Sequence, residues 1–158
     1  MMQTGLSQLV NCKDFSDVTF VVEGKDFYAH KCILSIMPSQ FKTMFKSGML
    51  ETQQTRFIIS DVSYPVFSSI MRFLYTGVFE FGAESEGQET SIDHLHEFLR
   101  ISDLYLIEEV KFECECRLKN IVDKQSVDLI LSWAELYNAD NLKDYCVWYK
   151  GCKHKKFY

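Results

Sequence analysis

Residues 14–51 constrain the fold strongly, because a strand-like alternation of apolar and polar residues is followed at once by helical spacing. Residues 17–22 alternate as a strand with one buried face does. The apolar side of that strand is formed by Val18, Phe20 and Val22. Gly24 then supplies the positive φ of a tight turn, and residues 25–30 return as a second strand. The pattern predicts a β-hairpin that leads directly into a helix.

Two short helices are expected after this hairpin. The first covers residues 31–37 and ends before Pro38, because proline disfavours helical geometry at the preceding residue. The second begins at Ser39, which is a good N-cap, and ends at Gly48. Its apolar residues, at helical spacing, are Phe41, Met44 and Phe45.

Further strands are predicted over residues 56–60 and 79–81, on either side of a helix that runs from Ser63 to Gly77. The acidic, polar run at residues 82–91 is typical of a solvated loop.

From Ile92 onward, apolar residues recur at helical intervals. Lys111 is expected on a solvent-facing side of one helix, and residues 151–156 as a frayed end. Strands followed by helices in this order indicate an α+β domain.

Composition excludes several functional classes. The chain has 158 residues, 47% hydrophobic residues and a net charge of −5, which is enough apolar content for a sizeable core. A nucleic-acid-binding domain usually shows a basic excess, which is absent here. No apolar run approaches the roughly 20 residues of a membrane span, and the N-terminus lacks the pattern of a signal peptide. We therefore expect no nucleic-acid partner, no membrane, and a cytoplasmic or nuclear location.

Neither a metal site nor a catalytic site is expected. The six cysteines fit a reducing compartment as buried small side chains. Cys114 and Cys116 lie two apart in a helical pattern and so face different ways. His30 follows an apolar strand, which favours a structural imidazole, and no serine lies in a nucleophile motif. No phosphate-binding glycine loop is present, so we expect no enzyme activity and no cofactor.

Five short motifs in order resemble the BTB (POZ) domain family over residues 14–122. They are Ser16-Asp17-Val18-Thr19-Phe20, Phe27-Tyr28-Ala29-His30-Lys31, Phe41-x-x-Met44-Phe45, Phe73-Leu74-Tyr75-Thr76-Gly77 and Ser102-Asp103-Leu104-Tyr105. The resemblance implies the BTB/POZ fold, a small mixed sheet covered by helical hairpins. It also implies a protein–protein interaction module, usually dimeric, rather than an enzyme.

Residues 123–149 resemble the helical extension, called the 3-box or BACK-like pair, that follows the domain in cullin-3 adaptors. The resemblance implies a substrate adaptor of a cullin-3 ubiquitin ligase, with an unknown substrate protein. In such adaptors two features face the cullin. One is a hydrophobic-x-Glu motif after the Phe-x-x-Met-Phe helix, and the other is a tyrosine further along the chain. Carried over to this chain, the cullin-binding residues are Phe45, Met49, Leu50, Glu51 and Tyr105.

The same resemblance implies self-association, with the chain pairing with itself or with other BTB chains. Asp17 and Lys31 match positions that place charge at the groove between subunits in family dimers. A short N-terminal helix is expected to contribute apolar contacts to the dimer. Those apolar residues are Leu6, Leu9 and Val10. Longer family forms have a more extensive N-terminal helix and strand, so a helix-packed dimer is expected here.

Two other interpretations fit the same motifs. One is a scaffold or transcriptional co-regulator that oligomerises without binding cullin. The other is a tetramerisation module of the channel type. The motifs leave two questions open: whether residues 1–13 and 150–158 are flexible or partly ordered ends, and whether the chain belongs to a longer protein.

Overall fold

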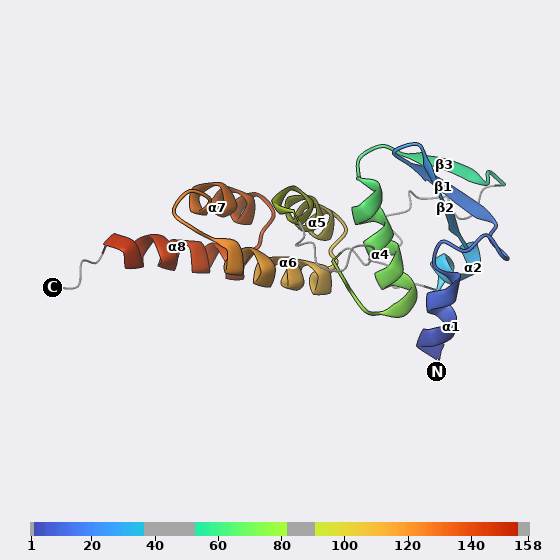
Figure 1. Cartoon of the computed structure of the whole chain (residues 1–158), viewed down its shortest axis with the longest axis horizontal. Coiled ribbons are helices and arrows are strands. Elements are labelled where there is room, and N and C mark those ends of the chain that lie inside the picture. Colours follow the sequence, from blue (N-terminus) through green and yellow to red (C-terminus); the bar gives the residue numbers. More distant parts are fainter. Residues whose placement is uncertain (1, 37–52, 82–90, 155–158) are drawn as a thin grey trace. The chain divides into compact units, whose positions relative to one another are not determined.

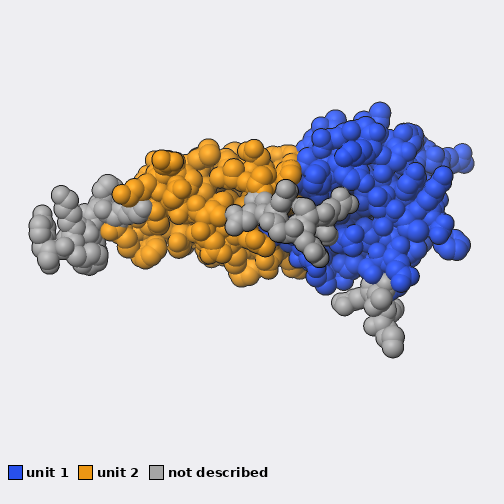
Figure 2. Space-filling view, in the orientation of Figure 1, with its two compact units in different colours: residues 1–90 blue, residues 91–158 orange. Residues whose placement is uncertain are grey.

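The computed structural model describes residues 2–36, 53–81 and 91–154, and it divides into two compact units. Residues 1–90 form unit 1 and residues 91–158 form unit 2 (Figure 2). Each unit is described separately below.

Unit 1 contains a three-stranded mixed sheet in the order β2-β1-β3 (Figure 1). Strand β1 (Val18–Val22) pairs antiparallel with β2 (Lys25–Ala29) and parallel with β3 (Arg56–Ile59). The turn between β1 and β2 has positive φ at both Glu23 (51°) and Gly24 (75°), as a two-residue hairpin turn of the favoured twist requires. The expected hairpin and the small mixed sheet are confirmed.

One face of this sheet packs on helix α4 (Tyr64–Thr76). Phe20 and Phe27 are fully buried and lie opposite each other on β1 and β2. The ring of Phe67 on α4 meets both of them edge-on, at centroid distances of 5.6 Å and 5.4 Å. Such edge-to-face pairs add to the stability gained from burial alone. This aromatic cluster is the core of unit 1.

Two more helices complete the described part of unit 1. Helix α1 (Met2–Leu9) packs on α4, and the short helix α2 (Lys31–Ser35) follows β2 directly. Helix α4 ends at Gly77, whose φ of 74° closes it in the left-handed conformation.

The prediction of a strand over residues 79–81 is wrong. The backbone there is irregular. Phe79 and Phe81 instead contact each other edge-on at 4.7 Å, and Phe79 also meets Phe73 at the end of α4. The two rings of this segment therefore pack against aromatic neighbours instead of lying in a strand.

Unit 2 consists of two helical hairpins (Figure 1). Helix α5 (Ile92–Leu104) packs on α6 (Glu108–Ile121), and α7 (Val127–Leu136) packs on α8 (Asp140–His154). Helices α6 and α8 also contact each other. The apolar centre of the unit is fully buried and includes Leu99, Ile107, Cys114, Leu118, Ile130, Leu142 and Cys146. Among the described helices of the whole chain, none is long and apolar enough to cross a membrane.

Two details of unit 2 differ from expectation. Helix α8 continues to His154, so residues 151–154 are helical and not a frayed end. Lys111, expected on a solvent-facing side, is buried. Its ammonium group pairs with the Asp103 carboxylate at 2.9 Å, and this contact across the α5–α6 hairpin offsets part of the cost of removing the charge from water.

Candidate protein-interaction surfaces

The turn between α5 and α6 exposes apolar side chains on a fixed backbone. Two hydrogen bonds close it: Leu106 N–H donates to the Asp103 carbonyl at 3.3 Å, and Ile107 N–H donates to the Ser102 carbonyl at 2.8 Å. This is the Schellman arrangement, in which the residue after the C-cap takes a left-handed conformation. That residue is Leu106, with φ of 56°.

Leucine is an unfavourable residue at this position, because its Cβ crowds the backbone when φ is positive. At three other helix ends among the described residues, the residue with positive φ is one that tolerates it: Asn11 after α1, Gly77 after α4 and Asn138 after α7. Leu106 is also 60% exposed, so burial does not compensate for its strained backbone. Strain of this kind is concentrated at functional sites.

Other apolar residues lie near Leu106 in the sequence. Leu104 and Phe112, on α5 and α6, are both more than half exposed. Tyr105, one of the expected partner-facing residues, caps α5 and is half-buried. We call Leu104, Tyr105, Leu106 and Phe112 the turn cluster. Sequence reasoning found Tyr105 and missed the other three.

A second set of apolar and aromatic groups joins α5 to α7. The ring of His96 stacks on Trp133 at 4.2 Å, and its Nε2 lies 3.1 Å from the Tyr137 hydroxyl. Burial, followed by the nearby Arg100 charge, lowers the pKa of His96 below its usual value. Leu129 and Leu136, one helical heptad apart on α7, are exposed. Apolar surface therefore continues along the outside of α7.

Two carboxylates attach the α7–α8 hairpin to α5 and α6. Asp103 accepts a hydrogen bond from Asn138 Nδ2 at 3.4 Å as well as from Lys111. Glu115, buried on α6, accepts a hydrogen bond from the Leu142 N–H at 2.8 Å. Leu142 lies in the first turn of α8, where backbone N–H groups lack partners within the helix. The two helical pairs of unit 2 are therefore joined by polar contacts, of which the Glu115–Leu142 hydrogen bond is buried and the Asn138–Asp103 hydrogen bond is exposed.

The residues expected at the dimer interface lie in unit 1. Leu6, Leu9 and Val10 are half-buried, and the helix that carries the first two packs on α4. Asp17 and Lys31 do lie together: Asp17 Oδ1 accepts a hydrogen bond from the Lys31 backbone N–H at 2.7 Å. Asp17 thus caps α2, while the Lys31 ammonium group donates to the Gln54 carbonyl at 3.3 Å.

His30 is a structural residue, as the sequence indicated. It is buried, and its Nε2 lies 2.9 Å from the Asp14 carbonyl oxygen, which only accepts hydrogen bonds. Nε2 therefore carries the proton, and Nδ1 accepts from the Tyr75 hydroxyl at 2.9 Å. The same hydroxyl accepts from the His30 backbone N–H at 3.0 Å. Burial raises the pKa of Tyr75 to about 12.

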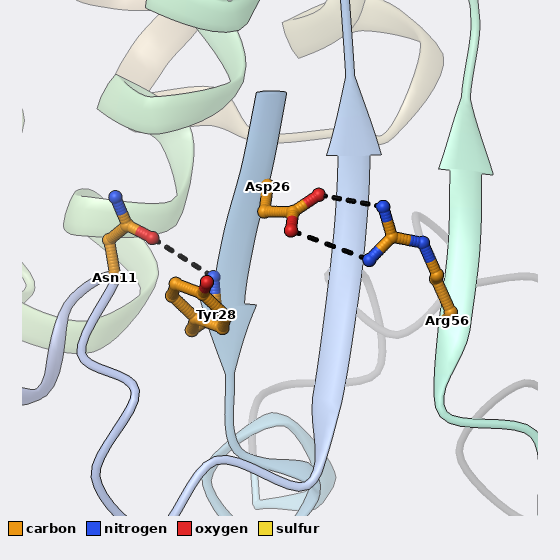
Figure 3. A network of polar contacts seen from close by, with 4 residues as sticks. All are labelled: Asn11, Asp26, Tyr28 and Arg56. Atoms are coloured by element: carbon orange, nitrogen blue, oxygen red, sulfur yellow. Dashed lines mark hydrogen bonds and ion pairs between the residues drawn. The ribbon is translucent and has the colours of Figure 1, made fainter. Parts of the chain in front are cut away.

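The outer face of the sheet is held by polar contacts rather than apolar packing (Figure 3). Arg56 on β3 reaches across β1 to the Asp26 carboxylate on β2, with its closest contact at 2.9 Å. Asn11 Oδ1 accepts from the Tyr28 N–H at 2.9 Å, which fixes the chain after α1 against β2. Exposed ion pairs of this kind add little stability.

The remaining expected site residues, Phe45, Met49, Leu50 and Glu51, lie outside the described residues. Within the described parts of the chain, no group of three or more His, Cys, Asp or Glu side chains is placed to hold a metal ion.

Comparison with known proteins identifies relatives in sequence and in structure. The family model described as BTB/POZ domain matches residues 6–122. A curated relative, the "ARM repeat protein interacting with ABF2" of Arabidopsis thaliana, is 32% identical over 140 residues. That match covers 89% of this chain but only 18% of the relative, so the chain spans under a fifth of its length.

Two solved structures share the fold. The BTB (Tramtrack and Bric a brac) domain of human Gigaxonin matches with a TM-score of 0.51 and 18% identity, over 73% of this chain and 86% of that one. The BTB domain of zebrafish PATZ1 matches with a TM-score of 0.50 and 20% identity, over 76% and 95% of the two chains. Together with the matched family model, these likenesses establish that the chain belongs to the BTB/POZ domain family.

Proposed function

We propose that this chain is a self-associating protein-interaction module that acts as a substrate adaptor of a cullin-3 ubiquitin ligase. Proteins of the BTB family are generally interaction modules rather than enzymes. An adaptor does no chemistry; it raises the effective concentration of a bound substrate near the transfer machinery.

The turn cluster is the observation that carries this proposal. It presents Tyr105, which the family resemblance assigns to the cullin contact, beside the exposed and strained Leu106. Interface hot spots are rich in aromatic anchors surrounded by other apolar contacts. A rigid turn also lowers the entropy lost on binding, because its backbone is already ordered by two hydrogen bonds.

The α7–α8 hairpin supports the same assignment. It follows the matched family region, which ends at Val122, and the exposed Leu129 and Leu136 extend apolar surface along α7. In cullin-3 adaptors the resembling helical pair adds to the partner contact. Glu115 and Asp103 hold the hairpin in place relative to α5 and α6 and so preserve that surface.

The proportions of the curated relative support a proposal about where a substrate would be recognised. The curated relative is named as an ARM repeat protein that interacts with ABF2, and the segment like this chain makes up 18% of it. We propose that substrate recognition resides either on another domain of a longer protein or on an associated BTB chain. A cytoplasmic or nuclear location is part of the proposal.

Calorimetric titration of the cullin-3 N-terminal region into the chain tests the adaptor role. Wild type is expected to bind, and Met49→Asp to lose binding because a charge replaces the apolar anchor. Leu106→Gly should weaken binding by about tenfold, since it removes an exposed contact. The same variant should raise the free energy of unfolding by about 1 kcal/mol, because glycine adopts positive φ without strain.

Leu106→Met is the matched control for Leu106→Gly. It keeps an apolar side chain of similar volume on the same left-handed backbone, so binding should be unchanged. Absence of binding by a folded wild-type chain contradicts the cullin assignment. It would leave the scaffold or co-regulator interpretation, in which the chain only oligomerises.

A further inference from the structure

Strand β3 forms one edge of the sheet in unit 1, and no further strand pairs with it among the described residues (Figure 1). In a parallel pair, alternate residues of a strand direct their backbone N–H and C=O groups toward the neighbouring strand. The Thr19 N–H on β1 donates to the Thr55 carbonyl at 2.7 Å, so Phe57, two residues further on, also faces β1. Arg56 and Ile58 therefore direct their backbone groups away from the sheet.

The two edges of this sheet differ in how they are covered. On β2, the outward N–H of Tyr28 donates to Asn11 Oδ1 at 2.9 Å, so the chain after α1 covers that edge (Figure 3). On β3, the Gln54 side chain donates to the Arg56 carbonyl at 2.7 Å and satisfies one outward acceptor. Within the described parts of the chain, the outward N–H and C=O of Ile58 have no hydrogen-bond partner. Such groups are a template for pairing with another extended chain.

The side chains of β3 do not protect its edge. Natural edge strands commonly carry a charge, a proline or a bulge that prevents pairing. Arg56 is the one charged residue within β3, and its guanidinium reaches across β1 to Asp26, away from the edge (Figure 3). The register with β1 is continuous over all four residues of β3, so no bulge interrupts it. Ile58, on the outer face, is 80% exposed.

The inner face of β3 is only partly covered. Phe57 lies opposite Phe20 in register, and the two rings are 6.2 Å apart. Phe20 is fully buried, whereas Phe57 and Ile59 are half-buried. Successive side chains of a strand point to opposite faces of the sheet. A strand added beside β3 would therefore cover Phe57 and Ile59 with one set of its side chains and lie beside Ile58 with the other.

The two ends of β3 carry opposite charges. At its start, the Lys31 ammonium group donates to the Gln54 carbonyl at 3.3 Å. Near its end lie two carboxylates, Asp61 in the chain after β3 and Glu23 in the turn after β1. Antiparallel pairs outnumber parallel ones in proteins. An antiparallel strand would begin near Asp61 and finish near Lys31, so a basic first residue and an acidic last residue complement these charges.

We propose that the outer edge of β3 binds an extended segment of a partner protein by antiparallel strand addition. The segment consists of β-branched residues, with a basic residue before them and an acidic residue after them. In this mode of recognition, backbone hydrogen bonds supply affinity and alternate side chains supply specificity. The inference goes beyond the adaptor role and does not depend on it, because β3 lies in unit 1 and the turn cluster in unit 2.

Fluorescence anisotropy of a labelled peptide, Lys-Val-Thr-Val-Thr-Val-Glu with blocked ends, titrated with the full chain tests the inference. Two analogues are compared with it, one N-methylated at its valines and the other at its threonines. Alternate amides of a strand face opposite edges, so only one analogue loses the hydrogen bonds to β3. That analogue should bind at least about tenfold more weakly, and the other within about threefold of the parent peptide.

Variants of the chain test the same contact from the other side. Ile58→Pro removes the outward N–H, which belongs to no ladder bond, so an edge strand tolerates it; peptide affinity should fall at least about tenfold. Ile58→Val keeps this N–H and a β-branched side chain, and it should bind as wild type does. Gln54→Ala frees the Arg56 carbonyl from its internal donor, so affinity should rise about threefold. Unchanged thermal unfolding midpoints separate loss of contact from loss of fold.

Several results would overturn the inference. They are absence of peptide binding by the folded wild-type chain, equal affinity of the two methylated analogues, and no gain in affinity in Gln54→Ala. Tighter binding of the peptide with its lysine and glutamate exchanged would overturn the antiparallel direction. A change in the sedimentation of the chain alone in Ile58→Pro, without a change in peptide affinity, would assign the edge to a second copy instead. Cullin titration of Ile58→Pro should match that of wild type, so the proposed function is decided separately.

Discussion

Buried polar side chains in unit 1 find their partners far away in the sequence. His30 uses both ring nitrogens, one toward the Asp14 carbonyl and one toward the Tyr75 hydroxyl, which is 45 residues distant. The apolar strand before His30 predicted a structural imidazole, and its burial confirms this. The sequence did not identify Tyr75 as its partner, because the contact depends on how α4 packs against the sheet.

Tyr75→Phe is expected to destabilise the fold by about 1–3 kcal/mol, since it leaves the His30 N–H and Nδ1 buried without a partner. Chemical denaturation of wild type and variant measures the difference. Tyr28→Phe is the control, because Tyr28 is only half-buried and its change should stay near zero. Equal stabilities of Tyr75→Phe and wild type would show that water satisfies His30.

The helix ends differ in whether the residue that closes them could be predicted from the sequence. Gly77 was expected to end its helix, and it does so with left-handed geometry. Leu106 adopts the same geometry after α5, and leucine carries no such signal. Helix propensity describes what a residue prefers, whereas the α5–α6 turn is set by the packing of two helices. Strained positions are therefore the ones that sequence reasoning misses.

The contact between α5 and α7 should depend on pH through His96. Its pKa is lowered, so the folded state favours the neutral ring. Stability from this effect is complete above the ordinary histidine value of about 6.5, and it is lost as pH falls from there through the lowered pKa of the folded state. His96→Phe keeps an aromatic ring on Trp133 but cannot titrate.

Unfolding free energies measured between pH 8 and pH 5 check this expectation. The wild-type value should fall relative to that of His96→Phe as pH drops below about 6.5. Arg100, Asp93 and Glu97 on α5 also influence His96 and are kept in both proteins. Parallel curves for the two proteins would mean that the ring's environment does not differ between the folded and unfolded states.

At the scale of the whole molecule, compact units and family boundaries do not coincide. The family model ends at Val122, yet α5 and α6 form one compact unit with α7 and α8. Glu115 gives the physical reason, because its buried carboxylate accepts a hydrogen bond from the first turn of α8. The helices after the family domain are thus held to it by a specific polar contact as well as by apolar burial.

Glu115→Ala is expected to destabilise unit 2 by about 1–3 kcal/mol, because the Leu142 N–H loses its buried acceptor. The substitution should increase the rate of amide hydrogen exchange more in α8 than in α5. Glu113→Ala, an exposed position on the same helix, is the matched control and should leave the exchange of α8 unchanged. Uniform exchange in both variants would argue that apolar burial alone holds the hairpin.

The sequence by itself determined the hairpin, the positions of most helices and membership in an interaction family, because strand alternation, helical spacing and short motifs are local patterns. Only the tertiary structure decided that Lys111 is buried against Asp103, that residues 79–81 pack as rings, and that Phe15 and Leu106 are exposed with positive φ. Those outcomes depend on which surfaces remain uncovered after the helices pack. Burial and strain are properties of that packing, and no local pattern of residues encodes them.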